Sequence, residues 1–275
     1  MRSGAPRRAV DGGVRADGYP DMIDSHVRFG DDLGVTDVDA LLRLLDTHGV
    51  RRAVLGPVGR WVAVDNREGN ETIAAAVRHH PDRLAGWAAA NPWYGVRAVD
   101  DLRRALDDGL VGLKLAPAQQ GFPLLSPLVD GLLHEVAQRA VPVYVVTGIP
   151  VAAEPFQLTE LARRWPTVPF VMGRSGRTDF ALDLVPALSG AANLVAETAY
   201  NGPGHLRRVA EAIGVDRMLF ASDLPANDLG LELARVDDAG FDEPARAQVL
   251  GAVAARLFAG PGFAVGATAG RRTPA

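Results

Sequence analysis

The stretch "LVGLKLAP", residues 110–117, has the pattern of a buried strand with one apolar face. Its alternate residues Val111, Leu113 and Leu115 are apolar, as expected for a strand face that helices cover. Lys114 then points to the opposite face. In a parallel sheet that closes on itself this face is the inside of a barrel, where active-site residues lie at the carboxyl ends of the strands.

Seven further runs rich in Val, Ile or Leu and bounded by Gly or Pro repeat the pattern: residues 21–27, 51–57, 83–92, 141–148, 168–176, 193–200 and 216–225. Amphipathic stretches with helical spacing alternate with them: residues 37–49, 70–81, 98–109, 128–140, 156–166, 178–190, 205–214 and 243–260. Eight strand–helix units predict an α/β protein with a (β/α)₈ TIM barrel. The alternative is an open doubly wound sheet, although no glycine-rich phosphate loop follows any strand.

The helix expected over residues 37–49 illustrates how the boundaries are assigned. Thr36 precedes it and is a candidate N-cap, because a side-chain oxygen at that position accepts a hydrogen bond from the first helical turn. Gly49 follows and is expected to end the helix.

Composition excludes several classes of protein and site. The 275 residues are 48% hydrophobic and 23% charged with net charge -4, which predicts a globular protein that binds no nucleic acid. The absence of cysteine excludes disulfides, thiolate metal sites and cysteine nucleophiles. No apolar run approaches the roughly 20 residues of a membrane helix, so no membrane association is expected.

The two ends of the chain lack apolar periodicity and are expected to be disordered tails, residues 1–18 and 262–275. One barrel domain over residues 19–261 is expected between them. Residues 1–18 also lack the apolar core of a secretory signal, so we expect a cytoplasmic protein.

The first strand carries an unusual concentration of polar residues in "IDSHVRFG", residues 23–30. Alternation predicts that Ile23, Ser25 and Val27 face outward. It places Asp24, His26 and Arg28 on the inward face. Polar groups inside a barrel are costly unless they are paired or functional. Lys114 joins them from the fourth strand and is the only lysine in the chain, although a GC-rich genome is a sufficient reason for the scarcity of lysine.

With these elements in order, the chain resembles the amidohydrolase-related branch of the amidohydrolase superfamily. The resemblance covers residues 20–260 and rests on several phrases in sequence: "MIDSH", "GNETIAAAVRHHPDRLAGWAAANPW", "GLVGLKLAP", "DRMLFASDLP" and "VAARLF". It implies a metal-dependent (β/α)₈ barrel whose members hydrolyse lactones and amides or decarboxylate substrates without oxidation. It also implies that homodimers are common.

The family's metal site, as the resemblance implies it, uses His-x-His after the first strand, one His after each of the fifth and sixth strands, and an Asp after the eighth. In this chain His26 and Asp223 match, whereas Arg28, Val146 and Arg174 replace the other ligands. Guanidinium has no lone pair to donate. At about 4 Å and an effective dielectric constant of about 20, each arginine opposes a divalent ion by about 8 kcal/mol. We therefore expect no metal ligands and no cofactor.

The replacements suggest a site for an anionic small molecule. Arg28 and Arg174 would bind a carboxylate or phosphate or stabilise an oxyanion, and Lys114 would add a third positive charge or act as a base or nucleophile. His26 would move a proton, oriented by Asp223. Glu197 and Asp24 are expected to be further acids that contact the substrate: together the candidate site comprises His26, Asp223, Lys114, Arg28, Arg174, Glu197 and Asp24.

Structural roles for the same residues remain open. Lys114 would neutralise Glu197 or Asp24, the arginines would pair with Asp223 and Glu197, and the aspartates would hold loops. The preferred function is metal-independent hydrolysis of an ester, lactone or amide. Decarboxylation or another lyase reaction is the second choice, and isomerisation or cyclisation is also open. The alternatives are an inactive relative that binds a ligand or a partner protein, and a metallohydrolase whose metal site has shifted.

Overall fold

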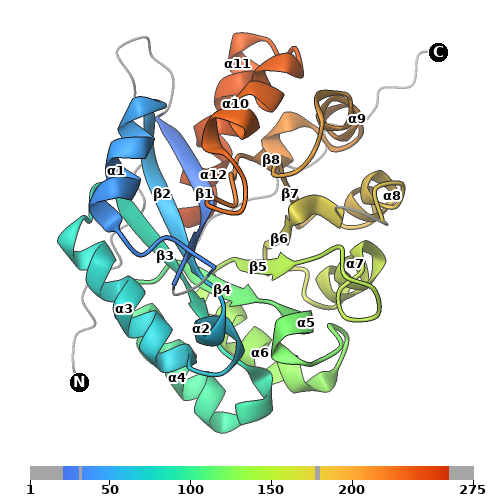
Figure 1. Cartoon of the computed structure of the whole chain (residues 1–275). Helices are drawn as coiled ribbons and strands as arrows, with labels where there is room; N and C mark the ends of the chain where they lie inside the picture. Colours follow the sequence, from blue (N-terminus) through green and yellow to red (C-terminus); the bar gives the residue numbers. More distant parts are fainter. Residues whose placement is uncertain (1–20, 31–32, 177–179, 260–275) are drawn as a thin grey trace.

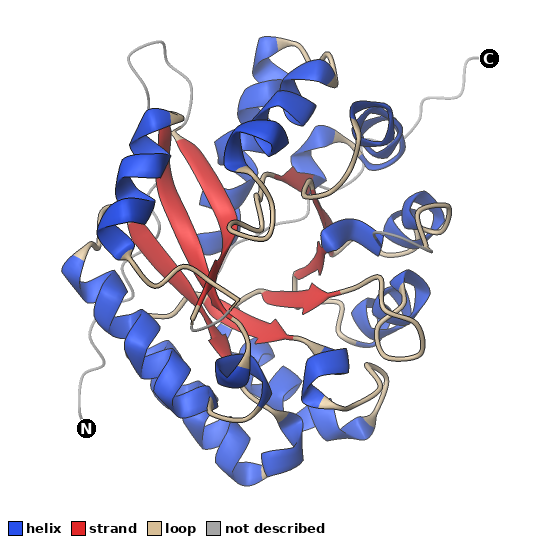
Figure 2. Cartoon of the chain, viewed as in Figure 1, coloured by secondary structure: helices blue, strands red, loops and turns tan. Residues whose placement is uncertain are grey.

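The computed structural model describes residues 21–30, 33–176 and 180–259. A single sheet of parallel strands lies at the centre, and helices surround it (Figures 1 and 2). The strand order follows the chain: β1 (Met22–Phe29), β2 (Val50–Pro57), β3 (Leu84–Ala89), β4 (Gly112–Leu115), β5 (Val143–Val146), β6 (Phe170–Gly173), β7 (Leu194–Glu197) and β8 (Met218–Leu219). The predicted α/β class and (β/α)₈ barrel are confirmed.

Backbone hydrogen bonds join the two ends of the sheet. The amide of Ser25 donates to the carbonyl of Phe220 at 2.9 Å, and the amide of Asp223 donates to the carbonyl of His26 at 3.1 Å. These bonds bring the middle of β1 against the segment that follows β8, so His26 and Asp223 become neighbours.

The helices that cover the sheet are mostly the predicted ones: α1 (Val38–Thr47), α3 (Asn66–His79), α4 (Val96–Asp107), α6 (Asp130–Arg139), α7 (Pro155–Arg164), α8 (Leu184–Ser189), α9 (Pro203–Ile213), α10 (Leu229–Asp238), α11 (Glu243–Ala247) and α12 (Val253–Phe258). Short helices α2 (Arg60–Ala63) and α5 (Pro117–Gln120) follow β2 and β4. None of the helices within the described ranges is long and apolar enough to cross a membrane.

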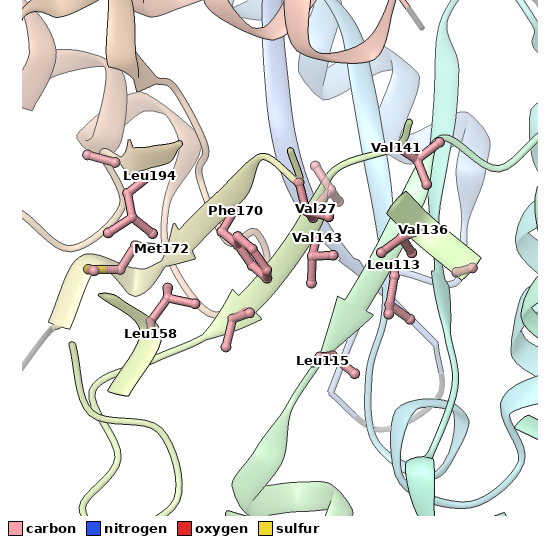
Figure 3. Packing of buried hydrophobic residues seen from close by; sticks show 14 of the residues in the cluster. Val27, Leu113, Leu115, Val136, Val141, Val143, Leu158, Phe170, Met172 and Leu194 are labelled. Atoms are coloured by element: carbon pink, nitrogen blue, oxygen red, sulfur yellow. The ribbon is translucent and has the colours of Figure 1, made fainter. Parts of the chain in front are cut away.

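Two apolar layers pack on the two faces of the sheet. The outer layer lies between strands and helices and includes Leu113, Val143, Phe170 and Leu194, together with Leu158 of α7 (Figure 3). Leu113 and Leu115 belong to this outer layer, as predicted. Val111, just before β4, packs against the inner layer instead, so the prediction is wrong at that residue.

The inner layer fills the barrel with residues of alternate parity, among them Trp87, Tyr144, Val171 and Leu219. Helix α12 closes one end of the barrel, where the Phe258 ring meets the Trp87 ring edge-on at 5.2 Å between centroids. The barrel is therefore packed at the bottom, and polar side chains occupy the end where the strands finish.

The facing predicted for β1 is wrong at one position. Ile23 belongs to the inner layer, whereas Val27 belongs to the outer layer as expected. The pairing of β1 with β2 is irregular between Asp24 and Val27, so strict alternation does not hold across this segment.

The predicted tails, residues 1–18 and 262–275, lie outside the described residues. The predicted single domain over 19–261 remains a prediction at its boundaries, because residues 19, 20, 260 and 261 also lie outside them.

Candidate active site

A row of three buried side chains crosses the carboxyl end of the barrel. Lys114 Nζ, from β4, lies 2.8 Å from His26 Nε2, from β1. His26 Nδ1 lies 3.1 Å from Asp223 Oδ1, in the loop after β8. The exposed fractions of the three residues are 2%, 2% and 1%, so the row is shielded from solvent. The three predicted catalytic residues are thus brought together in the order Lys114–His26–Asp223.

Local packing fixes the imidazole at the centre of the row. The His26 ring stacks on the Tyr144 ring with a centroid distance of 4.4 Å and an interplanar angle of 8°. On the neighbouring strand β2, a Cβ atom at Gly56 would lie 2.5 Å from His26 Nε2 and 3.2 Å from Lys114 Nζ. Only glycine at this position leaves room for the contact between the amine and the imidazole.

The ionisation of the row follows from its burial. Burial, assisted by the charge of Lys114, lowers the pKa of His26 to about 4. Burial also lowers the pKa of Lys114 to about 7; Asp223 opposes this shift, and Arg174 adds to it. Near neutral pH the imidazole is therefore uncharged, and a substantial fraction of the Lys114 amine has lost its extra proton.

Both carboxylate oxygens of Asp223 contact neighbouring side chains. While Oδ1 faces His26, Oδ2 accepts a hydrogen bond from the Tyr200 hydroxyl at 2.6 Å and lies 3.5 Å from Arg174 Nη2. Burial alone would raise the pKa of Asp223, but these partners outweigh it and hold the pKa well below its usual range. The carboxylate is a fixed negative charge that orients the imidazole.

Arg174 connects the row to solvent. Its side chain is 30% exposed, whereas Asp223 beneath it is 1% exposed. The guanidinium carbon also lies 5.8 Å from the centroid of the Tyr200 ring. Its position fits the predicted contact with an anionic ligand, because an approaching molecule meets this cation before the buried row.

Glu197 and Tyr144 form a second polar pair in the barrel interior. Both residues are 1% exposed, and they lie close enough together for each to shift the pKa of the other. Burial, followed by repulsion from Asp223, raises the pKa of Glu197 to about 8. Burial and Glu197 raise the pKa of Tyr144 well above its usual value. Both groups therefore carry a proton at neutral pH.

Asp24 lies apart from this row, at the seam between β1 and the loop after β8. Its oxygens accept hydrogen bonds from the Ser222 hydroxyl at 2.5 Å and from the amides of Ser222 and His26 at 3.0 and 3.2 Å. Asp24 is 0% exposed, and burial raises its pKa to about 7 despite these bonds. The geometry favours the loop-holding alternative over the predicted contact with substrate.

Arg28 lies at the end of β1, close enough for its charge to act on Lys114 and Tyr200. Its Nε atom is buried and has no hydrogen-bond partner among the described residues. Val146, at the end of β5, is 7% exposed and belongs to the inner apolar layer. Arg28 and Val146 therefore lie at the ends of β1 and β5, as predicted. Of the two arginines that were expected to pair with an acid, Arg174 is the one observed to contact Asp223.

Sequence reasoning missed Tyr144 and Tyr200. Tyr144 has the inward parity of its strand "VPVYVVTG", so the alternation that identified Lys114 could have identified it. Tyr200 ends the run "NLVAETAY" with a left-handed backbone, φ 67°, which no side-chain pattern signals. Arg174 and Asp223 share this conformation at the ends of β6 and β8, with φ 60° and 57°.

The side chains at this end of the barrel offer few of the groups that bind a metal ion. Within residues 21–30, 33–176 and 180–259, no three or more His, Cys, Asp or Glu side chains cluster closely enough to hold one. The Nε2 atom of His26 faces an amine, and Asp223 is held by an imidazole, a phenol and a guanidinium. His205, at the start of α9, lines a cavity of about 520 Å³ near α8 with Arg208 and Glu211.

Comparison with known proteins places the chain among related sequences and structures. The amidohydrolase family model (Amidohydro_2) matches residues 14–260. No curated protein matches the sequence.

Solved structures with the same fold include 2,6-dihydroxybenzoate decarboxylase from Rhizobium, with 18% identity over 86% of this chain and 98% of that chain and a TM-score of 0.74. The 5-carboxyvanillate decarboxylase from Sphingomonas paucimobilis shares 17% identity over 86% and 98% of the two chains, with a TM-score of 0.70. A dihydroxybenzoic acid decarboxylase from Polaromonas, solved with bound manganese, shares 18% identity over 86% and 96%, with a TM-score of 0.71.

Proposed function

We propose, from the premise that this chain belongs to the amidohydrolase family, that it is an enzyme that needs no metal ion and decarboxylates an anionic small molecule. The observation that carries the proposal is the buried row Lys114–His26–Asp223, in which both ring nitrogens of His26 already face protein groups. The decarboxylase activity of the structural neighbours agrees with the reaction, although at 14–18% identity they establish the fold alone.

The residues present do not fit a catalytic metal ion. A zinc site of the catalytic type uses three protein ligands and an open position. Here two donor residues, His26 and Asp223, contact each other, and Arg28 and Arg174 add positive charge near them. An ion could bind only after breaking the contact between His26 and Lys114 and repelling the arginines.

The cations supply a site for the substrate's negative charge. Arg174 is the partly exposed member and can bind a carboxylate through two parallel hydrogen bonds. Arg28 lies close to the same row, as its electrostatic effect on Lys114 indicates. An anion held between the two would displace little of the protein's own pairing, since Arg174 and Asp223 are 3.5 Å apart.

Proton transfer is assigned to two groups of different character. Loss of CO₂ leaves an electron pair on the carbon that carried the carboxylate, and this carbon must then take up a proton. Glu197 is protonated near neutral pH and buried beside Tyr144, so it is suited to donate that proton. His26, neutral and oriented by Asp223, faces the Lys114 amine through Nε2 and would relay a proton to or from substrate.

Hydrolysis of an ester, lactone or amide is the second candidate. The contact between His26 and Asp223 favours it, because an imidazole oriented by a carboxylate can take a proton from an attacking water molecule. In this structure, however, His26 Nε2 faces Lys114 at 2.8 Å, so that atom would first have to part from the amine.

The test is to purify the protein without chelators, measure bound metal by elemental analysis, and assay CO₂ release before and after metal depletion. We expect trace metal and unchanged release of CO₂. Stoichiometric zinc or manganese, or activity that metal restores, would support a metal-dependent enzyme instead. Ester or lactone cleavage without CO₂ release would favour hydrolysis, and ligand binding without turnover of either kind would favour an inactive relative.

A further inference from the structure

We propose that Lys114 is a nucleophile that forms an imine with the substrate, and that the substrate is therefore a carboxylate with a ketone at the β position. This inference rests on the proposed function and deepens it, because it names the substrate class and the group that accepts the electrons of the breaking bond. Lys114 and His26 are both 2% exposed, so the reaction would take place out of contact with bulk water.

The first support is the geometry of the row. A nucleophile in contact with a base, which is itself oriented by a third group, is the arrangement found at activated nucleophiles. Here the Lys114 amine contacts His26 at 2.8 Å, and His26 contacts Asp223 at 3.1 Å. The carboxylate at Nδ1 favours the tautomer with hydrogen on that nitrogen, which leaves Nε2 free to accept a proton from the amine.

The second support is how the amine is held. Lys114 Nζ donates a hydrogen bond to the carbonyl of Pro57 at 2.9 Å, so two partners fix its position at the carboxyl end of the barrel. A structural lysine in such a place would neutralise a carboxylate, but within the described residues the ion pairs of this end of the barrel are made by Arg174 and His26. Lys114 instead contacts an imidazole and a carbonyl, neither of which requires a cation.

The third support is chemical. Removing CO₂ from a carboxylate generates electron density that needs an acceptor, and a metal ion does not fit this site. Arginines stabilise charge but form no bond that can receive an electron pair. A protonated imine can, because its carbon–nitrogen double bond becomes a single bond as the enamine forms.

The steps balance as follows. The Lys114 amine attacks the ketone carbon, and the resulting carbinolamine loses water to give a protonated imine. The bond to the carboxylate then breaks, CO₂ leaves, and its electron pair forms the enamine. Protonation at carbon regenerates the imine, which one water molecule hydrolyses to the product ketone and the free amine. The net reaction consumes one proton and needs no oxidant or reductant.

The groups that would supply protons for these steps lie nearby. Loss of water from the carbinolamine requires an acid, and the Glu197 carboxyl and the Tyr144 phenol are buried groups that keep their protons near neutral pH. Lys114 Nζ lies 5.8 Å from the centroid of the Tyr144 ring. Arg174 would hold the carboxylate until it leaves.

The chain offers an unusually direct test, because Lys114 is its only lysine. Metal-depleted protein is mixed with acetylacetone, a small diketone that converts a reactive amine into a stable, ultraviolet-absorbing enaminone. In parallel it is incubated with acetoacetate and reduced with borohydride. We expect the enaminone absorbance and, by peptide mass spectrometry, both adducts on the peptide that contains residue 114. Absence of both adducts from that peptide overturns the imine.

Two variants complete the design. Lys114→Arg keeps the positive charge without a nucleophile and leaves the N-terminal amine as the only one in the chain, so any signal that persists is not due to Lys114. Lys114→Met repeats the comparison if the longer arginine disturbs folding, which circular dichroism reports. Metal-free turnover without an adduct would reject the imine and leave the proposed function standing, whereas metal-dependent turnover would reject the proposed function.

Discussion

Single side chains determine the charge distribution of this site, and under the proposed function Arg174 and His26 are two on which turnover would depend. We expect Arg174→Ala and His26→Ala each to lower kcat/KM by at least about 100-fold, since one removes the anion contact and the other the proton carrier. Both variants should keep the wild-type circular dichroism spectrum and a cooperative melt.

The matched control is Arg43→Ala, which removes an exposed arginine from α1. Its kcat/KM should equal that of the wild type. Full activity in Arg174→Ala or His26→Ala would rule out the role assigned to that residue.

Glu197 makes stability depend on pH with a definite sign. Its pKa is about 8 in the folded protein and near 4.5 when unfolded, so the folded state holds the proton more tightly. The stability from this group is fully present below about pH 4.5 and is lost as pH rises toward about 8. Glu197→Gln, which cannot ionise, should be more stable than the wild type above about pH 8, on the order of a few kcal/mol.

The measurement is urea unfolding of both proteins at about pH 5 and about pH 9. The free energy of unfolding of the Glu197→Gln variant, relative to that of the wild type, should increase from about pH 5 to about pH 9. Lys114 acts in the other direction: its folded pKa of about 7 lies below the unfolded value of 10.5, so its contribution becomes more favourable as pH rises through that window. An equal difference between the two proteins at both pH values would contradict the buried, protonated state of Glu197.

At the scale of elements, β2 shapes the site without contributing a functional side chain. A Cβ atom at Gly56 would lie 2.5 Å from His26 Nε2, so Gly56→Ala must displace the imidazole from Lys114. We expect a loss of kcat of about tenfold or more with a destabilisation of about 1–3 kcal/mol. Gly202→Ala is the matched control, because a Cβ atom there meets nothing within 4 Å. Equal activity of the two variants would show that the imidazole contact does not matter.

The elements also show how far sequence patterns reach. Alternation along β4 correctly assigned Lys114 to the interior and Leu113 to the outer layer, because both faces of this strand are buried in a regular sheet. It failed at Ile23, because the irregular pairing of β1 shifts the parity. Register irregularities depend on the neighbouring strand and leave no signature in the residues themselves.

Helix boundaries were predicted unevenly: the helix expected over residues 70–81 begins at Asn66, and the one expected over 178–190 begins at Leu184. Thr36 was the expected cap of the first helix, but Asp37 is the N-cap, and its carboxylate accepts from the amide of Ala40 at 2.9 Å. Helix α10 was missed altogether, although Asp228 caps it by accepting from the amide of Leu231. Two neighbouring capping candidates compete on equal terms in a sequence, and only the backbone decides between them.

For the whole molecule, apolar side chains pack the closed end of the barrel, and the open end carries the candidate site. Phe258 is 4% exposed and packs edge-on against Trp87, away from the row at the strand ends. Phe258→Ala should therefore lower the free energy of unfolding by about 3–5 kcal/mol. Below the melting temperature, kcat per folded molecule should remain unchanged. Thermal denaturation and single-temperature kinetics check both parts, and a large fall in kcat would show that the two ends are coupled.

The overall architecture was predictable because it depends on many repeated units, each of which carries the same apolar pattern. The residues proposed for the site could be named from the sequence, but their contacts could not. The sequence pointed to His26, Lys114 and Asp223. It could not show that His26 lies between the other two, because this contact depends on the closure of β1 against the segment after β8. The placement of Asp24 at that seam, rather than facing substrate, depends on the same closure.

Arg174, Tyr200 and Asp223 have a left-handed backbone, so the side chains proposed to act in the site lie at strained positions that lower the stability of the fold. Side chains at such φ values carry strain on the order of 1–3 kcal/mol each, which glycine would relieve. Replacement by glycine would also delete the guanidinium, the phenol and the carboxylate together with the strain. Under the proposed function, a more heat-tolerant version obtained at these three positions would thus lose activity, and selection that preserves activity would have to act elsewhere in the barrel.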